Sequence, residues 1–281
     1  MMDRRTFLAG MASLVAAPLV TEAQRAHDPK AAKVGFLLGS ALSSPSVPLE
    51  PFKQALREKG WTEGQNLTLE YRYAEGHYEQ LPTLARELVD LSVDVIVTDG
   101  TPPTRAAMNV TKTIPIVMAT TGDPVGAGLV SSLARPGGNV TGASFFFSEV
   151  QAKRLELLKE AAPEITRVAV VYNALNPVHE PAVVAIEAAG KQLKVQIQRL
   201  TVRASTDFDS VFTVMTKQKM DAVTVLEDPM INLQSRRVID VALRGRVPAV
   251  FGHASLVAAG GFMSYAPNRA DFWRRAALLT D

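Results

Sequence analysis

The chain has 281 residues, 47% of them hydrophobic, with a formal net charge of +2 and no cysteine. A charge so close to zero, without a block of lysine and arginine, argues against nucleic acid as a partner. The absence of cysteine excludes a disulfide framework, a thiol nucleophile and lipidation at an N-terminal cysteine.

The first 23 residues have the three parts of a secretory signal. Arg4 and Arg5 form a positive start, residues 7–20 carry no charge, and small residues lead up to Ala23. The apolar run is shorter than the roughly 20 residues that span a bilayer, which disfavours a membrane anchor. The arginine pair resembles a twin-arginine signal, and the general secretory route is the alternative. We therefore expect cleavage after Ala23 and a protein that is free in the periplasm.

After the signal, short β-branched runs alternate with longer amphipathic segments, which predicts repeated strand–helix units. The strands expected in the first half are residues 33–38, 67–73, 93–98, 114–119 and 140–145. The helices expected there are residues 50–59, 78–91, 103–110 and 125–133. Nearly continuous apolar strands are typical of a parallel sheet that is covered on both faces.

The second half repeats this pattern after a helix expected at residues 151–161. Its expected strands are residues 167–172, 195–200, 222–226 and 249–251, and its expected helices are residues 178–193, 208–219 and 233–244. No flexible linker separates the halves, so we expect a tight hinge near residues 145–149. The sequence predicts an α/β fold of two Rossmann-like, doubly wound lobes, residues 32–145 and 146–265, with a ligand cleft between them.

Polar residues follow the strands at the edge where such sheets bind ligands. They lie at residues 39–40, 99–101, 120–124, 173–177 and 227–229. Ser40 and Thr101 either contact a ligand or act as ordinary helix caps. Asp123 and Asp228 each precede a proline, so each either faces the ligand or forms a turn or cap. Five such loops from two lobes together favour a binding cleft.

Sequence motifs for catalysis or cofactor binding are weak. Residues 126–128 imitate the start of a dinucleotide fingerprint without its third glycine, and the sequence has no P-loop. Its four histidines are scattered without metal-ligand spacing. Glu227 and Asp228 could form an acid/base pair, but neighbours at a strand exit point in different directions. We expect no cofactor, no metal and no enzymatic activity.

Three stretches carry a resemblance to a known family. They read TIPIVMATTGDPVGAGLVSSLARPGGNVTGAS, KRLELLKEAAPEITRVAVVYNALNP and VPAVFGHASLVAAGGFMSYAPNRADFWRRAA. These stretches resemble the substrate-binding proteins of ABC transporters, among them tryptophan- and tyrosine-type binding proteins. The resemblance covers nearly all of the chain after the signal. It implies the type I periplasmic binding fold, in which two lobes close on a small ligand.

The resemblance also implies which residues contact the ligand. The first lobe would contribute Thr101, Thr121 and Asp123, and the second lobe Asn173, Asn176 and Asp228. For an amino acid, threonine hydroxyls and helix N-termini suit the carboxylate, whereas Asp123 or Asp228 suits the ammonium group. Ser40 completes the expected set from its position at a strand end.

The implied function is capture of a small molecule, such as an amino acid or a related metabolite. The implied partners are an ABC permease and its ATPase subunit, with membrane contact only through the permease and the binding protein itself a monomer. A periplasmic hydrolase and a ligand sensor on the same fold are the alternatives. Family members continue beyond the helix that carries Arg274 and Arg275, so we expect residues 266–281 to be the start of a truncated return segment.

Overall fold

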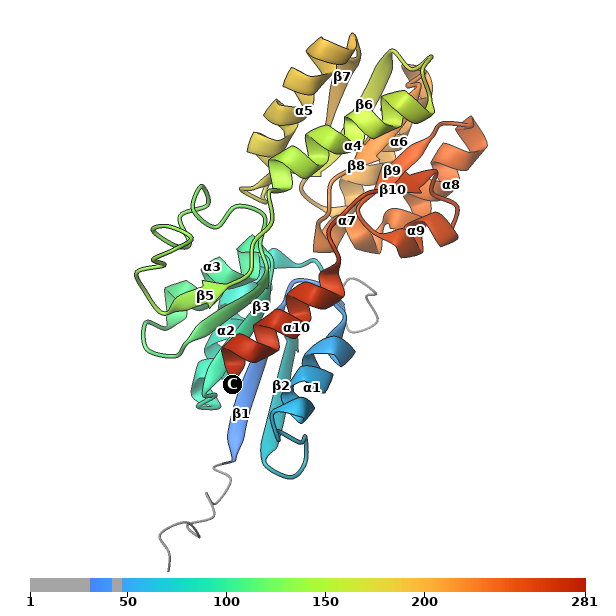
Figure 1. The fold of residues 1–281 in the computed structure, drawn as a ribbon. Coiled ribbons are helices and arrows are strands. Elements are labelled where there is room, and N and C mark those ends of the chain that lie inside the picture. The colour runs from blue at the N-terminus through green and yellow to red at the C-terminus, as the bar shows by residue number, and fades with distance from the viewer. Residues whose placement is uncertain (1–30, 42–46) are drawn as a thin grey trace, which may run out of the picture. The chain divides into compact units, whose positions relative to one another are not determined.

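The computed structural model describes residues 31–41 and 47–281. The predicted signal, residues 1–23, lies outside the described residues. Two parallel five-stranded sheets, each with helices on both faces, account for most of the described chain (Figure 1). This confirms the predicted α/β fold of two doubly wound lobes.

The first lobe has the strand order β2-β1-β3-β4-β5. Its strands are β1 (Ala32–Leu38), β2 (Leu67–Tyr73), β3 (Val95–Asp99), β4 (Ile116–Thr120) and β5 (Val140–Gly142). Its helices are α1 (Leu49–Glu58), the 3₁₀ turn η2 (Tyr78–Gln80), α2 (Leu81–Asp90) and α3 (Thr101–Val110). The pairing of β3 with β4 shifts register between Thr98 and Asp99, at the carboxyl end of the sheet.

The second lobe has the strand order β10-β9-β8-β6-β7, which is the topology of the first lobe repeated. Its strands are β6 (Arg167–Asn173), β7 (Gln196–Val202), β8 (Ala222–Val225), β9 (Ala249–Phe251) and β10 (Met263–Ser264). Its helical segments are α4 (Phe147–Ala161), α5 (His179–Leu193), η3 (Ser205–Asp207), α6 (Phe208–Lys217), α7 (Pro229–Leu233), α8 (Ser235–Gly245) and α9 (Ala254–Ala258). The sequence repeat is therefore a repeat of structure.

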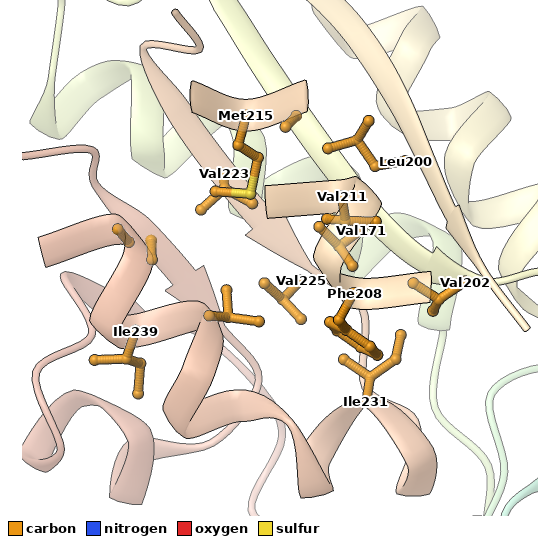
Figure 2. Close-up of a cluster of buried hydrophobic side chains, with 14 of the residues drawn as sticks. Val171, Leu200, Val202, Phe208, Val211, Met215, Val223, Val225, Ile231 and Ile239 are labelled. Atoms are coloured by element: carbon orange, nitrogen blue, oxygen red, sulfur yellow. The ribbon is translucent and has the colours of Figure 1, made fainter. Parts of the chain in front are cut away.

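Each sheet separates two apolar cores, as expected for strands that are buried on both faces. In the second lobe, one core lies between the sheet and helices α6 and α8, where Phe208, Met215 and Ile239 are buried (Figure 2). The core on the other face contains buried residues of α4 and α5. The carboxyl ends of the strands are thereby fixed by packing.

The last helix, α10 (Arg269–Thr280), follows the second lobe in sequence but packs on the first, beside α1 (Figure 1). Its Trp273 is fully buried, with ring centroids 6.3 Å from Phe36 and 6.1 Å from Phe52. The chain therefore passes between the lobes twice, at residues 143–146 and again at residues 265–268.

One predicted helix is wrong. Residues 125–133 form turns, in which the Asp123 carboxylate accepts a hydrogen bond of 2.8 Å from the Gly126 N–H. Gly128 has a φ of +64°, which lies in the left-handed region that glycine favours and a right-handed helix does not contain. Two glycines within three residues thus override the apolar spacing that suggested a helix.

The other predicted strands and helices are observed, with ends shifted by a few residues. The prediction did not include α7, α9 or β10, which have five, five and two residues and are too short to show a periodicity. Within residues 31–41 and 47–281, no helix combines the length and the apolar character that crossing a membrane requires.

Candidate functional site

A narrow cavity of about 70 Å³ lies where the carboxyl ends of the two sheets meet. From the first lobe, its lining includes Thr101, Thr121 and Phe145. From the second lobe, it includes Asn176 and Asp228. The cavity is therefore bounded by both lobes, as the predicted cleft requires.

The first-lobe wall contains two buried threonine hydroxyl groups. Thr101 is 2% exposed and Thr121 is 1% exposed, and neither Oγ1 atom has a hydrogen-bond partner among the described residues. Thr101 is the first residue of α3, but Gly100 occupies the cap position and no side chain caps the helix. By contrast, the hydroxyl of nearby Thr104 donates to the Gly100 carbonyl at 2.8 Å. An unpaired buried hydroxyl is costly, which makes Thr101 and Thr121 candidate ligand contacts.

The second-lobe wall contains a buried carboxylate with four hydrogen bonds. Asp228 is 1% exposed, and its Oδ1 atom accepts from the Met230 N–H at 3.0 Å and from Asn173 Nδ2 at 3.2 Å. Its Oδ2 atom accepts from Asn176 Nδ2 at 3.1 Å and from the Tyr78 hydroxyl at 2.7 Å. Asp228 caps α7, as one of its two predicted roles required, and it also lines the cavity.

Two further carboxylates line the cavity, and each is neutralised by an arginine. The Nη2 atom of Arg269 lies 2.9 and 3.0 Å from the two carboxylate oxygens of Asp99. Arg154 donates to Glu227 at 2.6 and 3.2 Å and has a fully buried side chain. Burial would raise the pKa of the Glu227 carboxyl, but the guanidinium outweighs it and lowers that pKa to about 2.

Asp228 differs from these acids because no cationic side chain pairs with it in the part of the chain that the structure describes. The neighbouring His179 is fully buried, and burial lowers its pKa. Its Nδ1 accepts from the Asn173 N–H at 3.0 Å, so this ring is neutral. When Arg154 is counted with the lining residue that it pairs with, these three acids and two arginines leave one net negative charge, at Asp228.

His253 also lines the cavity. Burial, followed by the positive charge of Arg269, lowers its pKa to about 4, so it is neutral at pH 7. Among residues 31–41 and 47–281, no group of three histidine or acidic side chains could hold a metal ion.

The predicted contacts divide into those at the cavity and those outside its lining. Thr101, Thr121, Asn176 and Asp228 line it. The remaining three, which are Ser40, Asp123 and Asn173, are not part of this lining. Ser40 is buried without a partner for its hydroxyl among the described residues, Asn173 supports Asp228 from behind, and Asp123 is exposed within the turn described above.

Sequence reasoning missed five residues that shape this site. They are Tyr78, Arg154, Asp99, His253 and Arg269, which no motif marks. Asp99 belonged to a predicted strand-end loop, so its position could have singled it out. Tyr78, Arg154 and Arg269 meet their partners across 73 to 170 positions, and a single sequence carries no signal for such pairs.

A family model for ABC transporter substrate binding proteins matches residues 43–280. A tyrosine-binding protein of Clostridioides difficile is 30% identical over 209 residues, which cover 74% of this chain and 60% of that protein. The chain thus matches less than two thirds of the length of this curated relative.

Two solved structures differ in how well they superpose on the chain. A Streptococcus pneumonia ABC domain in complex with L-Trp has a TM-score of 0.82 and 26% identity, covering 89% of this chain and 83% of that one. The ligand-free, open structure of a Clostridium difficile substrate binding protein has a TM-score of 0.61 and 25% identity, with the same two coverages. The chain as a whole therefore superposes better on the L-Trp complex than on the open structure.

Proposed function

Because the chain belongs to the ABC transporter substrate-binding protein family, we propose that its cleft captures a small zwitterion, such as an amino acid. We further propose that lobe closure retains the ligand until a membrane permease with its ATPase subunit receives it. The observation that carries this proposal is that the two lobes line the cavity with groups of different chemistry. Within the described part of the chain, two buried hydroxyls without hydrogen-bond partners line the cavity from the first lobe, and a carboxylate without a paired cation lines it from the second.

The first-lobe wall suits a carboxylate. The hydroxyls of Thr101 and Thr121 can donate to it, and Thr101 opens α3, whose N-terminus carries a partial positive charge. Pro102 and Pro103 follow in the first turn and have no N–H, so the start of α3 offers few backbone donors beside these hydroxyls.

The second-lobe wall suits an ammonium group through its charge. All four acceptor positions of the Asp228 carboxylate are already in use, so a ligand amine would be attracted by the net negative charge and not by a vacant lone pair. Phe145 and Phe147, whose ring centroids are 5.7 Å apart, line the same cavity and offer an apolar surface for the rest of the ligand.

The proposal is tested by matched ligands that differ in one charged group. L-tryptophan carries both groups, indole-3-propionate lacks the ammonium group, and tryptamine lacks the carboxylate; L-tyrosine is a second zwitterion. At 100 times its dissociation constant, a binding ligand should stabilise the fold by roughly 2.7 kcal/mol. We expect a melting shift with a zwitterion and a weaker one with either truncated analogue. Equal shifts for all the indole compounds would contradict the zwitterion site.

Export to the periplasm is part of the same proposal, supported by the family and by the signal-like start of the sequence. N-terminal sequencing of the exported protein should begin at Gln24. Replacing Arg4 and Arg5 by lysine should block export if the route is the twin-arginine one, and unchanged export would favour the general secretory route.

A further inference from the structure

The two lobes meet beside the cavity in a small contact that we call the seam. On the first lobe it consists of Gly39, Gly76 and Tyr78, and on the second lobe of Asp228 and Pro229 at the start of α7. In Figure 1, α7 lies at the end of the second lobe that is nearest the first. The seam is separate from the threonine wall and from the aromatic side chains that line the cavity.

Tyr78 supplies the directed interaction of the seam. Its hydroxyl donates to Asp228 Oδ2 at 2.7 Å, whereas the other three donors to this carboxylate belong to the second lobe. Burial and then the charge of Asp228 raise the pKa of Tyr78 well above its usual value, so the hydroxyl keeps its proton and remains a donor. A hydrogen bond to a buried charge is stronger than one between neutral groups.

Two glycines allow the backbones of the two lobes to approach. A Cβ atom placed on Gly39 would lie 2.9 Å from Pro229 Cγ, and one on Gly76 would lie 3.1 Å from the Met230 Cα atom. Gly76 also has a φ of +83°, which disfavours other residues, but Gly39 has no such backbone restriction. A methyl group at Gly39 would therefore obstruct the contact between the lobes and little else.

We infer that Tyr78 is a positioning residue for ligand capture, which stabilises the closed arrangement of the lobes by completing the Asp228 hydrogen bonds without touching the ligand. Opening the lobes would remove the Tyr78 donor from Asp228 and leave three of its four hydrogen bonds. Closure is thus coupled to a contact that forms whichever small molecule fills the cavity. This inference rests on the proposed function for its role in capture, whereas the contact itself is independent of ligand identity.

The variants are chosen to separate closure from folding. Tyr78→Phe removes only the donating hydroxyl, and Tyr73→Phe is the matched control, since that hydroxyl is buried without a partner among the described residues. Gly39→Ala adds the obstructing methyl group. Pro229→Ala in the Gly39→Ala background removes the atom that a Cβ at position 39 would meet at 2.9 Å, so it should restore closure in part.

Lobe distance is measured by double electron–electron resonance. Because the chain has no cysteine, spin labels can be placed at Arg86→Cys on α2 and Lys191→Cys on α5, both exposed. We expect a short-distance population in wild type and in Tyr73→Phe, without ligand or with L-tryptophan or L-tyrosine, and a smaller one in Tyr78→Phe and Gly39→Ala. Calorimetry should show roughly ten- to hundredfold weaker binding in Tyr78→Phe, with the same order of preference among ligands.

The outcomes distinguish the seam from the proposed ligand class. If Tyr78→Phe and Gly39→Ala keep the wild-type distances, or if wild type shows no short-distance population under any condition, the inference is overturned. A short-distance population that the seam variants lose, but that neither amino acid increases, supports the seam and counts against the amino-acid proposal.

Discussion

Arg154→Met is expected to lower the free energy of unfolding by about 3–5 kcal/mol, because it leaves a buried carboxylate without its cation. The guanidinium also donates to Gln151 at 2.8 Å and to the Tyr265 carbonyl at 2.7 and 3.1 Å. The pKa of Glu227 gives an independent magnitude, since its lowering from 4.5 to about 2 corresponds to about 3 kcal/mol. This contribution is present above about pH 4.5 and is lost as the pH falls through about 2.

The assay is urea unfolding at pH 7, monitored by circular dichroism, which gives the free energy of unfolding directly. In a thermal scan, each kcal/mol should shift the melting temperature by roughly 2–4 °C. Arg237→Met is the matched control, because Arg237 pairs with Asp209 while their side chains are 47% and 80% exposed. A pair this exposed should contribute at most about 1 kcal/mol. If Arg154→Met and Arg237→Met lower the free energy of unfolding by similar amounts, then burial does not make the Arg154–Glu227 pair more stabilising than an exposed pair.

Thr101→Val and Thr121→Val should each raise the free energy of unfolding of the ligand-free protein, by up to about 1–3 kcal/mol, because each removes a buried hydroxyl that has no partner among the described residues. Calorimetry should nevertheless show roughly tenfold weaker binding of a carboxylate ligand, whereas Thr224→Val, which removes another partnerless buried hydroxyl, should leave affinity unchanged. Wild-type affinity in both cavity variants would rule out the carboxylate wall. Since burial and then Arg269 lower the pKa of His253 to about 4, the unfolded state binds a proton more readily between pH 6.5 and 4. The free energy of unfolding should therefore decrease as the pH is lowered from 6.5 to 4, and this decrease should be less steep in His253→Gln. Equal slopes for the two proteins in urea titrations would refute this.

Much of the fold could be predicted because apolar runs and their spacing decide which segments are strands buried on both faces. The strand-end rule then located Thr101, Thr121, Asn176 and Asp228, since parallel strands bring their carboxyl ends to one edge. The same rule included Asp123, which lies in a loop at that edge but bonds to its own turn. The position of a strand end therefore predicts which loops lie near the ligand, but it does not predict which side chains of those loops point toward it.

Contacts between distant segments could not be predicted in this way. Tyr78 and Asp228 are 150 positions apart, and Arg269 and Asp99 are 170 apart. A tyrosine opening a 3₁₀ turn looks like any partly apolar surface residue until the second lobe is placed over it. Arg269 reaches Asp99 only because α10 returns to the first lobe, where Trp273 anchors it.

The three acids at the cavity have different roles because their partners differ. Asp99 and Glu227 are each held by an arginine, which fixes α10 and the second crossing near Tyr265 and leaves no net charge for a ligand. Among the described residues, Asp228 is held by neutral donors alone, one of which comes from the opposite lobe. A carboxylate arranged in this way keeps its negative charge for a cationic ligand group, and it also loses one hydrogen bond when the lobes separate. Asp228→Asn should therefore weaken both amine recognition and closure, whereas Tyr78→Phe should weaken closure alone and leave the preference for an amine intact.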